Sequence, residues 1–413
     1  MAMKYIACAA VPLLMAALPA QAVTVEQLNQ QVQQMNKRIS EQNNKLRING
    51  FASFGMAISD EEMAYNGVND EVTFNRFSKM GVQMSFNIDA KNSVVMQLVS
   101  RGNEGWNTNA EWAYFKHDFG SGFSGKIGRI RLPAYQLSEF LDVGYATPYA
   151  QVPAETYDSL EPFANMEGVD LSYSMDLGDN TALFQVVYGR AKDDEFDLKD
   201  IIGLSGVLQA DTWNVRVALS QASVSIIQAD AAAVVTNFYQ AETEDLDGNF
   251  ASVGFTYDPG DLYFTTEYTT LEADGQVVDA DSMYATFGYR MGRFMPTLTY
   301  AMAESQDDDE RELAPAQAAA IAGASGGAFT TADVLTGAAG IQAASDRNTT
   351  RIGLGLRYDM SPGTALKVQY DIIEVDDDKS GLFDDTAWAT NVLTAGENPD
   401  GANILTISID TVF

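Results

Sequence analysis

The chain has 413 residues and a net charge of −32, which argues against nucleic-acid binding because that function needs clustered Lys and Arg. Its one cysteine, Cys8, and one histidine, His117, exclude cysteine nucleophiles, cysteine zinc sites and metal sites built from several histidines. A Ser-His pair around His117 is the one enzymatic possibility left, so we expect no enzyme and no cofactor.

Residues 1–22 have the pattern of a secretory signal peptide. Lys4 supplies the positive charge, residues 5–18 form an apolar run, and Ala20-Gln21-Ala22 offers a cleavage site. The run is shorter than the roughly 20 apolar residues of a membrane-spanning helix. The pattern predicts export of the chain and removal of Cys8, so that no disulfide holds the mature protein.

Residues 23–46 have helical periodicity. Apolar residues recur at alternating steps of three and four, with one polar core position at Gln42: Val25, Leu28, Val32, Met35, Ile39 and Leu46. About three heptads are too short for a stable isolated helix, so the segment predicts a self-associating coiled coil. The alternative is a single amphipathic helix that plugs the following domain or leans on it.

Residues 47–413 change to a period of two. Met80, Val82, Met84, Phe86 and Ile88 alternate with Lys79, Gly81, Gln83, Ser85 and Asn87. Segments of about ten residues with apolar side chains on one face and polar ones on the other are typical of transmembrane barrel strands. The polar face is rich in Gly, Ser and Arg, which suits a water-filled interior better than a soluble core.

Tight turns alternate with long polar segments along this region. Seven turn signals, such as Asp258-Pro259-Gly260-Asp261, separate eight long loops, near 59–71, 102–108, 131–166, 192–203, 224–249, 272–281, 304–346 and 376–402. This pattern predicts an all-β fold: a sixteen-stranded antiparallel transmembrane barrel, wide enough for an aqueous channel. Within the 304–346 loop, an Ala-rich stretch could form a short helix.

The segment from Gly128 to Tyr157 carries a family resemblance. Gly128-Arg129-Ile130-Arg131-Leu132-Pro133, the stretch from Ser138 to Tyr149, and Val152-Pro153-Ala154-Glu155-Thr156-Tyr157 resemble Gram-negative trimeric porins. The coiled-coil start is similar to DcaP-like porins in particular, whereas the acidity of this chain departs from the family. The resemblance implies a loop, 131–166, that folds into the barrel after the fifth strand and narrows it.

A structureless loop of this length is unusual unless it has a function. Its aromatic residues could pack against the inner wall, so that its carboxylates reach the lumen. We expect the constriction to be formed by Arg129, Arg131, Glu139, Asp142, Glu155, Asp158 and Glu161. The alternative is a loop that covers the outer surface or contacts a neighbouring subunit.

Strand alternation places a set of basic residues on the inner wall: Lys79, Arg101, Arg216, Arg290, Arg351, Arg357 and Lys367. Basic side chains opposite acidic loop residues would create a field across the narrowest point, and charged rings select ions in this way. Alternatively, some of these cations pair with carboxylates on the same wall: Glu111, Asp170, Glu267 and Asp371.

The chain ends in an alternating strand with a terminal aromatic residue, Phe413. This ending resembles the closing strand of outer-membrane proteins, whose last residue is recognised during insertion by the barrel-assembly machinery. The resemblance therefore implies a role for Phe413 in membrane insertion.

Together these features predict a homotrimeric porin in the outer membrane of a Gram-negative bacterium, in contact with membrane lipid and lipopolysaccharide. We expect passive diffusion of small hydrophilic solutes, preferentially anions. The acidic loops favour a cation-preferring general porin as the alternative. A sugar-specific channel is a further alternative, although the four Trp residues do not form a ladder by parity, and a closed structural barrel is another.

Overall fold

A computed structural model of the chain describes residues 45–157, 164–228, 242–275, 277–306, 313–327, 329–376, 379–394 and 396–413. Most of the predicted coiled coil (23–46), and the loop residues Asp158 and Glu161, lie outside the described residues. Leu46, the last position of that helical pattern, is the first residue of β1, so the barrel begins one residue earlier than predicted.

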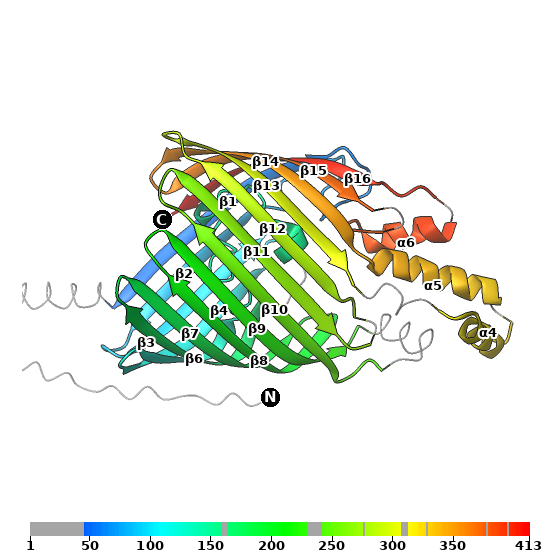
Figure 1. Cartoon of the computed structure of the whole chain (residues 1–413), viewed down its shortest axis with the longest axis horizontal. Helices are drawn as coiled ribbons and strands as arrows, with labels where there is room; N and C mark the ends of the chain where they lie inside the picture. Colours follow the sequence, from blue (N-terminus) through cyan, green and yellow to red (C-terminus); the bar gives the residue numbers. More distant parts are fainter. Residues whose placement is uncertain are drawn as a thin grey trace, which may run out of the picture. The chain divides into compact units, whose positions relative to one another are not determined.

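Sixteen antiparallel strands form a closed barrel in which β1 pairs with β16, as predicted. Figure 1 shows the strands running obliquely across the barrel wall. The strands are β1 (Leu46–Ser59), β2 (Lys79–Asn87), β3 (Asn92–Arg101), β4 (Thr108–Gly120), β5 (Phe123–Arg131), β6 (Asn165–Leu177), β7 (Asn180–Lys192), β8 (Phe196–Gln209), β9 (Trp213–Ile226), β10 (Leu246–Tyr257), β11 (Leu262–Ala273), β12 (Ala280–Tyr289), β13 (Phe294–Ser305), β14 (Asn348–Ser361), β15 (Thr364–Val375) and β16 (Gly401–Val412).

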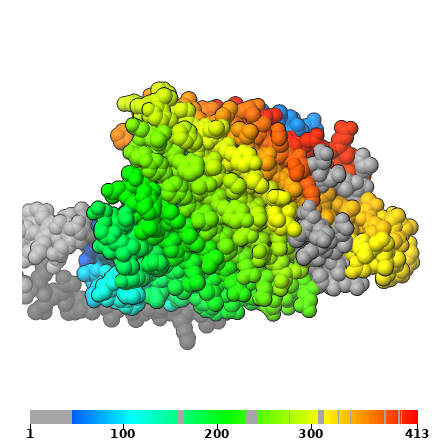
Figure 2. Space-filling view, viewed as in Figure 1, coloured from blue at the N-terminus to red at the C-terminus, as the bar shows by residue number. Residues whose placement is uncertain are grey.

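The alternation of side chains follows the two faces of the wall. In β7, Phe184, Val186 and Tyr188 are exposed, whereas Gln185 and Val187 between them are buried. Outward side chains of successive strands form a continuous surface on the face shown in Figure 2. The exposed residues are therefore apolar, as a lipid-facing surface requires, and the buried ones point into the barrel.

One loop boundary differs from the prediction. The sequence pattern predicts a loop over 192–203, but β8 begins at Phe196. The register between β8 and β9 shifts between Lys199 and Ile202, and Asp200 has a positive φ of 50°. This bulge interrupts the alternation, which is why the first part of β8 lacks the period of a strand.

The described parts of the longer connections contain five helical segments: η1 (Gly144–Ala146), α2 (Ala154–Tyr157), α4 (Pro315–Ala324), α5 (Thr331–Ser345) and α6 (Asp385–Thr394). Figure 1 shows α4, α5 and α6 beyond one end of the barrel. The side chain of Thr330 accepts a hydrogen bond from the backbone N–H of Asp333 and so caps α5. No helix among the described residues is long and apolar enough to cross a membrane.

Phe413 lies at the seam that closes the barrel. Its backbone N–H donates to the carbonyl of Gly50 at 2.9 Å, and its carbonyl accepts from the N–H of Gly50 at 2.8 Å. A Cβ on Gly50 would lie 2.3 Å from the Phe413 ring, so a larger residue there would require this ring to move. The terminal residue thus extends the pairing between β1 and β16.

Candidate functional site

The described part of the segment between β5 and β6, residues 132–157, lies against the inner face of the barrel. Its carbonyls accept hydrogen bonds from residues of widely separated strands: Pro133 from Arg216 of β9 at 3.4 Å, Leu141 from Lys79 of β2 at 3.3 Å, and Gly144 from Lys367 of β15 at 2.6 Å. One segment can contact strands on different sides of a closed barrel only from its interior. We call residues 132–157, the described part, the inner loop.

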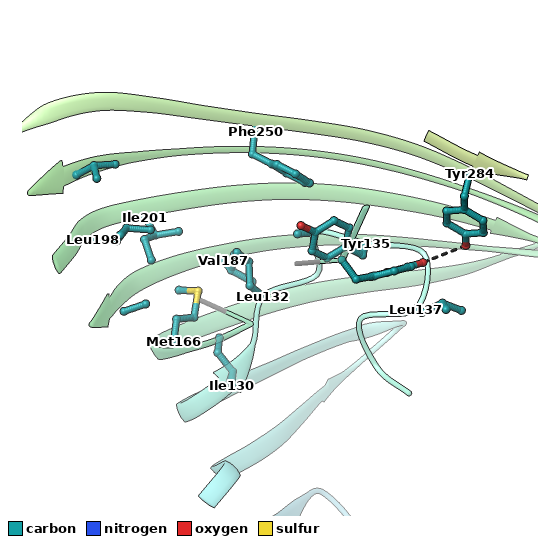
Figure 3. Packing of buried hydrophobic residues seen from close by; sticks show 14 of the residues in the cluster. Ile130, Leu132, Tyr135, Leu137, Met166, Val187, Leu198, Ile201, Phe250 and Tyr284 are labelled. Carbon is teal, nitrogen blue, oxygen red and sulfur yellow. Dashed lines mark hydrogen bonds between the residues drawn. The ribbon is translucent and has the colours of Figure 1, made fainter. Parts of the chain in front are cut away.

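Aromatic and aliphatic side chains attach the inner loop to one side of the wall. The Tyr135 ring lies 5.2 Å from the Phe250 ring of β10 and 5.1 Å from the Tyr157 ring. Figure 3 shows Leu132 and Tyr135 among wall residues such as Val187 and Ile201. These contacts fill the interior on the side of β6–β13 with a packed apolar cluster, which explains why Val187 is apolar although it points inward.

Glu267 of β11 fastens two points of the inner loop at once. Its Oε1 accepts from the backbone N–H of Gln136 at 2.6 Å, and its Oε2 accepts from the Tyr157 hydroxyl at 2.6 Å. Burial raises the pKa of Tyr157 well above its usual value, so the hydroxyl stays protonated and donates. The sequence pattern places Glu267 on the inner wall but gives no sign of this role.

Three of the predicted wall cations also hold the inner loop. Arg351 contacts Glu155 at 3.4 Å and Asp371 at 2.6 Å, and Lys367 contacts the Tyr149 carbonyl at 2.7 Å. Arg357 donates to the carbonyls of Tyr145 at 2.8 Å and Thr147 at 3.0 Å.

All three cations point inward, as predicted, but two of them do not line an open passage. Only 2% of the Arg351 side chain and 1% of the Lys367 side chain are exposed. The prediction that they line the pore is corrected, because the inner loop covers them. Its carbonyls and carboxylates need donors, and these cations provide them.

Three further cations contact Asp142 at the other side of the inner loop. Arg101 donates to its two carboxylate oxygens at 2.9 and 3.0 Å, Arg131 contacts it at 3.1 Å and Lys79 at 3.6 Å. Burial alone would raise the pKa of Asp142, but these three charges outweigh it and hold the pKa well below its usual range. Asp142 is therefore ionised at neutral pH.

A cavity of about 810 Å³ lies between the inner loop and the wall around β1–β5. Its lining includes Leu141, Tyr149 and Val152 of the inner loop and amides such as Asn109 and Asn165. Its charged lining among the described residues is balanced between six cations and six carboxylates: Arg76, Lys79, Arg101, Arg129, Arg131, Lys192, Glu104, Glu111, Asp142, Asp193, Asp194 and Asp410.

The other predicted site residues lie elsewhere. Arg129 forms an ion pair with Glu167, which lies opposite it on β6. Arg129 belongs to the same row of β5 as the exposed Ile127, and it also borders the cavity. Glu139 is exposed and lies 3.7 Å from Arg216. Arg290 pairs with Asp258 at 2.6 Å beside the turn between β12 and β13. Some of the predicted wall cations do pair along the wall, Arg101 with Glu111, Arg351 with Asp371 and Lys367 with Asp410. Lys126 pairs with Asp170 in the same way.

The barrel and its inner loop match known proteins. A family model described as Gram-negative porin matches residues 7–378. The chain belongs to the Gram-negative porin family. The porin is thus a channel protein of the outer membrane, with the fold predicted from its sequence. No curated protein matches its sequence.

Solved structures of porins share its fold at low sequence identity. The OmpF of Salmonella typhi, in complex with daunomycin, has a TM-score of 0.57 and 12% identity, covering 89% of this chain and 97% of that one. An anion-selective porin from Comamonas acidovorans gives 0.55 and 12%, with 89% and 99% covered. The DcaP channel of Acinetobacter baumannii gives 0.51 and 10%, with 89% and 97% covered.

Proposed function

We propose that this porin lets small hydrophilic solutes diffuse passively through the cavity between the inner loop and β1–β5, and that it favours anions. The inner loop acts as the constriction, since it fills the opposite side of the barrel with packed side chains. Solutes are then confined to the polar side, where the three cations around Asp142 face the cavity.

The exposure of the paired charges supports the anion preference. In the ion pair between Lys79 and Asp142, 25% of the lysine side chain is exposed but only 7% of the carboxylate. Arg101 is likewise more exposed than Glu111, at 16% against 5%. A solute ion therefore meets the cations first, and the carboxylates lie behind them.

The acidic outer segments support the rival, a cation-preferring porin. Asp193 and Asp194 border the cavity, and Glu104 is more exposed than the Arg101 that it contacts. A sugar-specific channel needs a row of aromatic side chains along the passage. Trp388 is instead buried in an apolar cluster with Phe383, and no Trp of the described residues borders the cavity.

The reversal potential of the porin in a planar bilayer under a potassium chloride gradient tests the proposal. We expect the reversal potential to have the sign of an anion-preferring pore. A unit charge about 4 Å from an ion in water contributes ~1 kcal/mol, so Lys79→Gln should lower the chloride preference by up to about fivefold. Lys91→Gln removes the same charge from an exposed turn and serves as control. A potassium-preferring potential in the unmodified porin would refute the anion preference.

We further infer the partners of the porin. The outward apolar rows require outer-membrane lipid, and we infer contact with lipopolysaccharide at the end of the barrel that carries the long connections. We propose a homotrimer, and recognition of Phe413 by the barrel-assembly machinery before the seam with Gly50 closes. We propose a channel role without catalysis, in line with the porin family to which the chain belongs.

A further inference from the structure

Three basic side chains from three strands meet at one point of the cavity wall. Lys79 begins β2, Arg101 ends β3 and Arg131 ends β5, and all three contact the carboxylate of Asp142. Asp142 belongs to the inner loop and not to the wall. The wall itself thus provides a set of converging cations, and the loop brings the anion.

The geometry around Asp142 is that of a bound carboxylate. Arg101 donates from Nη2 to both oxygens, at 2.9 and 3.0 Å, and from Nε to Oδ1 at 3.2 Å. Arg131 adds a bond to Oδ2 at 3.1 Å. Such forked contacts are the usual way in which arginine recognises a carboxylate. Any free carboxylate of the same size would find the same donors if Asp142 were absent.

The charges nearby do not cancel this site without Asp142. Glu111 contacts Arg101 at 2.7 Å and Arg131 at 3.6 Å, and Glu104 contacts Arg101 at 3.2 Å. In the absence of Asp142, the cations Lys79, Arg101 and Arg131 would face two carboxylates, Glu104 and Glu111. None of the contacts of these two carboxylates given above involves Lys79. All three cations border the cavity of about 810 Å³, so a solute can reach them.

We propose that Lys79, Arg101 and Arg131 form a binding station for a solute carboxylate, and that Asp142 occupies this station as a tethered competitor. The proposal rests on the proposed passage of solutes through this cavity. A tethered group acts at an effective concentration in the millimolar range, so dilute solute anions do not displace Asp142 and are not retained. The inner loop thereby keeps the station filled and the passage open to flow.

Chemical rescue tests this proposal. Asp142→Ala removes the carboxylate and keeps the Cβ, and acetate is a small carboxylate that can reach the donors left behind. We expect the reversal potential of Asp142→Ala to shift toward the chloride equilibrium potential. At constant ionic strength, added acetate should return it toward the unmodified value. Acetamide, the neutral analogue of similar shape, should have no effect.

Two variants make the result specific. Asp142→Asn removes the charge but keeps the site filled, so its potential should shift like that of Asp142→Ala without any response to acetate. Glu155→Gln removes another carboxylate of the same loop. Its partner Arg351 then stays buried and paired with Asp371. We expect no acetate response in Glu155→Gln, and none in the unmodified porin.

Equal effects of acetate and acetamide on Asp142→Ala would overturn the proposal, as would an equal acetate response in the unmodified porin. If Asp142→Ala fails to fold, an unshifted potential in Asp142→Asn refutes the proposal by itself. Failure of the anion preference would appear instead in the sign of the unmodified porin's potential. The two proposals can therefore fail separately.

Discussion

At the scale of single residues, two carboxylates fix the inner loop from opposite sides. Glu267 accepts from a backbone N–H and a tyrosine hydroxyl and forms no ion pair with a described residue, whereas Asp142 is surrounded by three cations. Both are buried, and buried charges need hydrogen-bonding partners of this kind. The difference is that Asp142 borders the cavity, so the proposed function makes ion passage depend on the protonation state of Asp142.

The pH dependence of Asp142 follows from its depressed pKa. An unfolded aspartate titrates near about 3.9, and the three cations hold Asp142 well below that despite its burial. Its stabilising effect is therefore complete above about pH 4 and is lost as the pH falls through the folded value. We expect the difference in reversal potential between the unmodified porin and Asp142→Asn to stay constant from about pH 7 to pH 4. Disappearance of the difference by about pH 5 would contradict this pKa.

At the scale of elements, the alternation of the sequence predicts which face of a strand looks outward, but not what lies against the inner face. It placed Arg351 and Lys367 correctly on the inner face. It could not show that a loop 196 to 223 residues away in sequence covers them. The sequence also failed to predict the start of β8, because the bulge at Asp200 breaks the alternation there. Pairing with β7 and β9, and not an alternating pattern of its own, maintains this part of the strand.

The outward rows allow a test of this assignment. Leu204 is exposed near the middle of β8, so Leu204→Arg would put a charge close to the centre of the bilayer. Such a charge costs about 2–4 kcal/mol at the midplane but about 0–1 near the interface. Leu262→Arg, on the same outward face at the start of β11, is the matched control. Guanidinium unfolding in lipid vesicles measures the free energy of unfolding of both variants. Equal losses of stability in the two would show that Leu204 does not face the lipid core.

At the scale of the whole molecule, the barrel is complete without the segment that precedes it. Every strand pair, including the seam between β1 and β16, lies within residues 46–413. The sequence predicted this barrel well because its strands repeat one simple pattern. Its prediction of a coiled coil over residues 23–46 rests on spacing alone and stays a prediction. The predicted coiled coil therefore implies that subunit association can be changed by mutation without changing the barrel.

Replacing the apolar positions Leu28 and Val32 by Ser should weaken the trimer, because a coiled coil depends on these positions for its packing. Heating in mild detergent, followed by size-exclusion chromatography, should show trimers dissociating at a lower temperature than those of the unmodified porin. The matched control replaces Gln30 and Gln34, which lie off the apolar stripe, by Ser. Single-channel conductance should not change in either variant, because the proposed passage is the cavity between the barrel wall and the inner loop. A rise in conductance would instead support a helix that plugs the barrel, and unchanged dissociation would argue against the coiled coil.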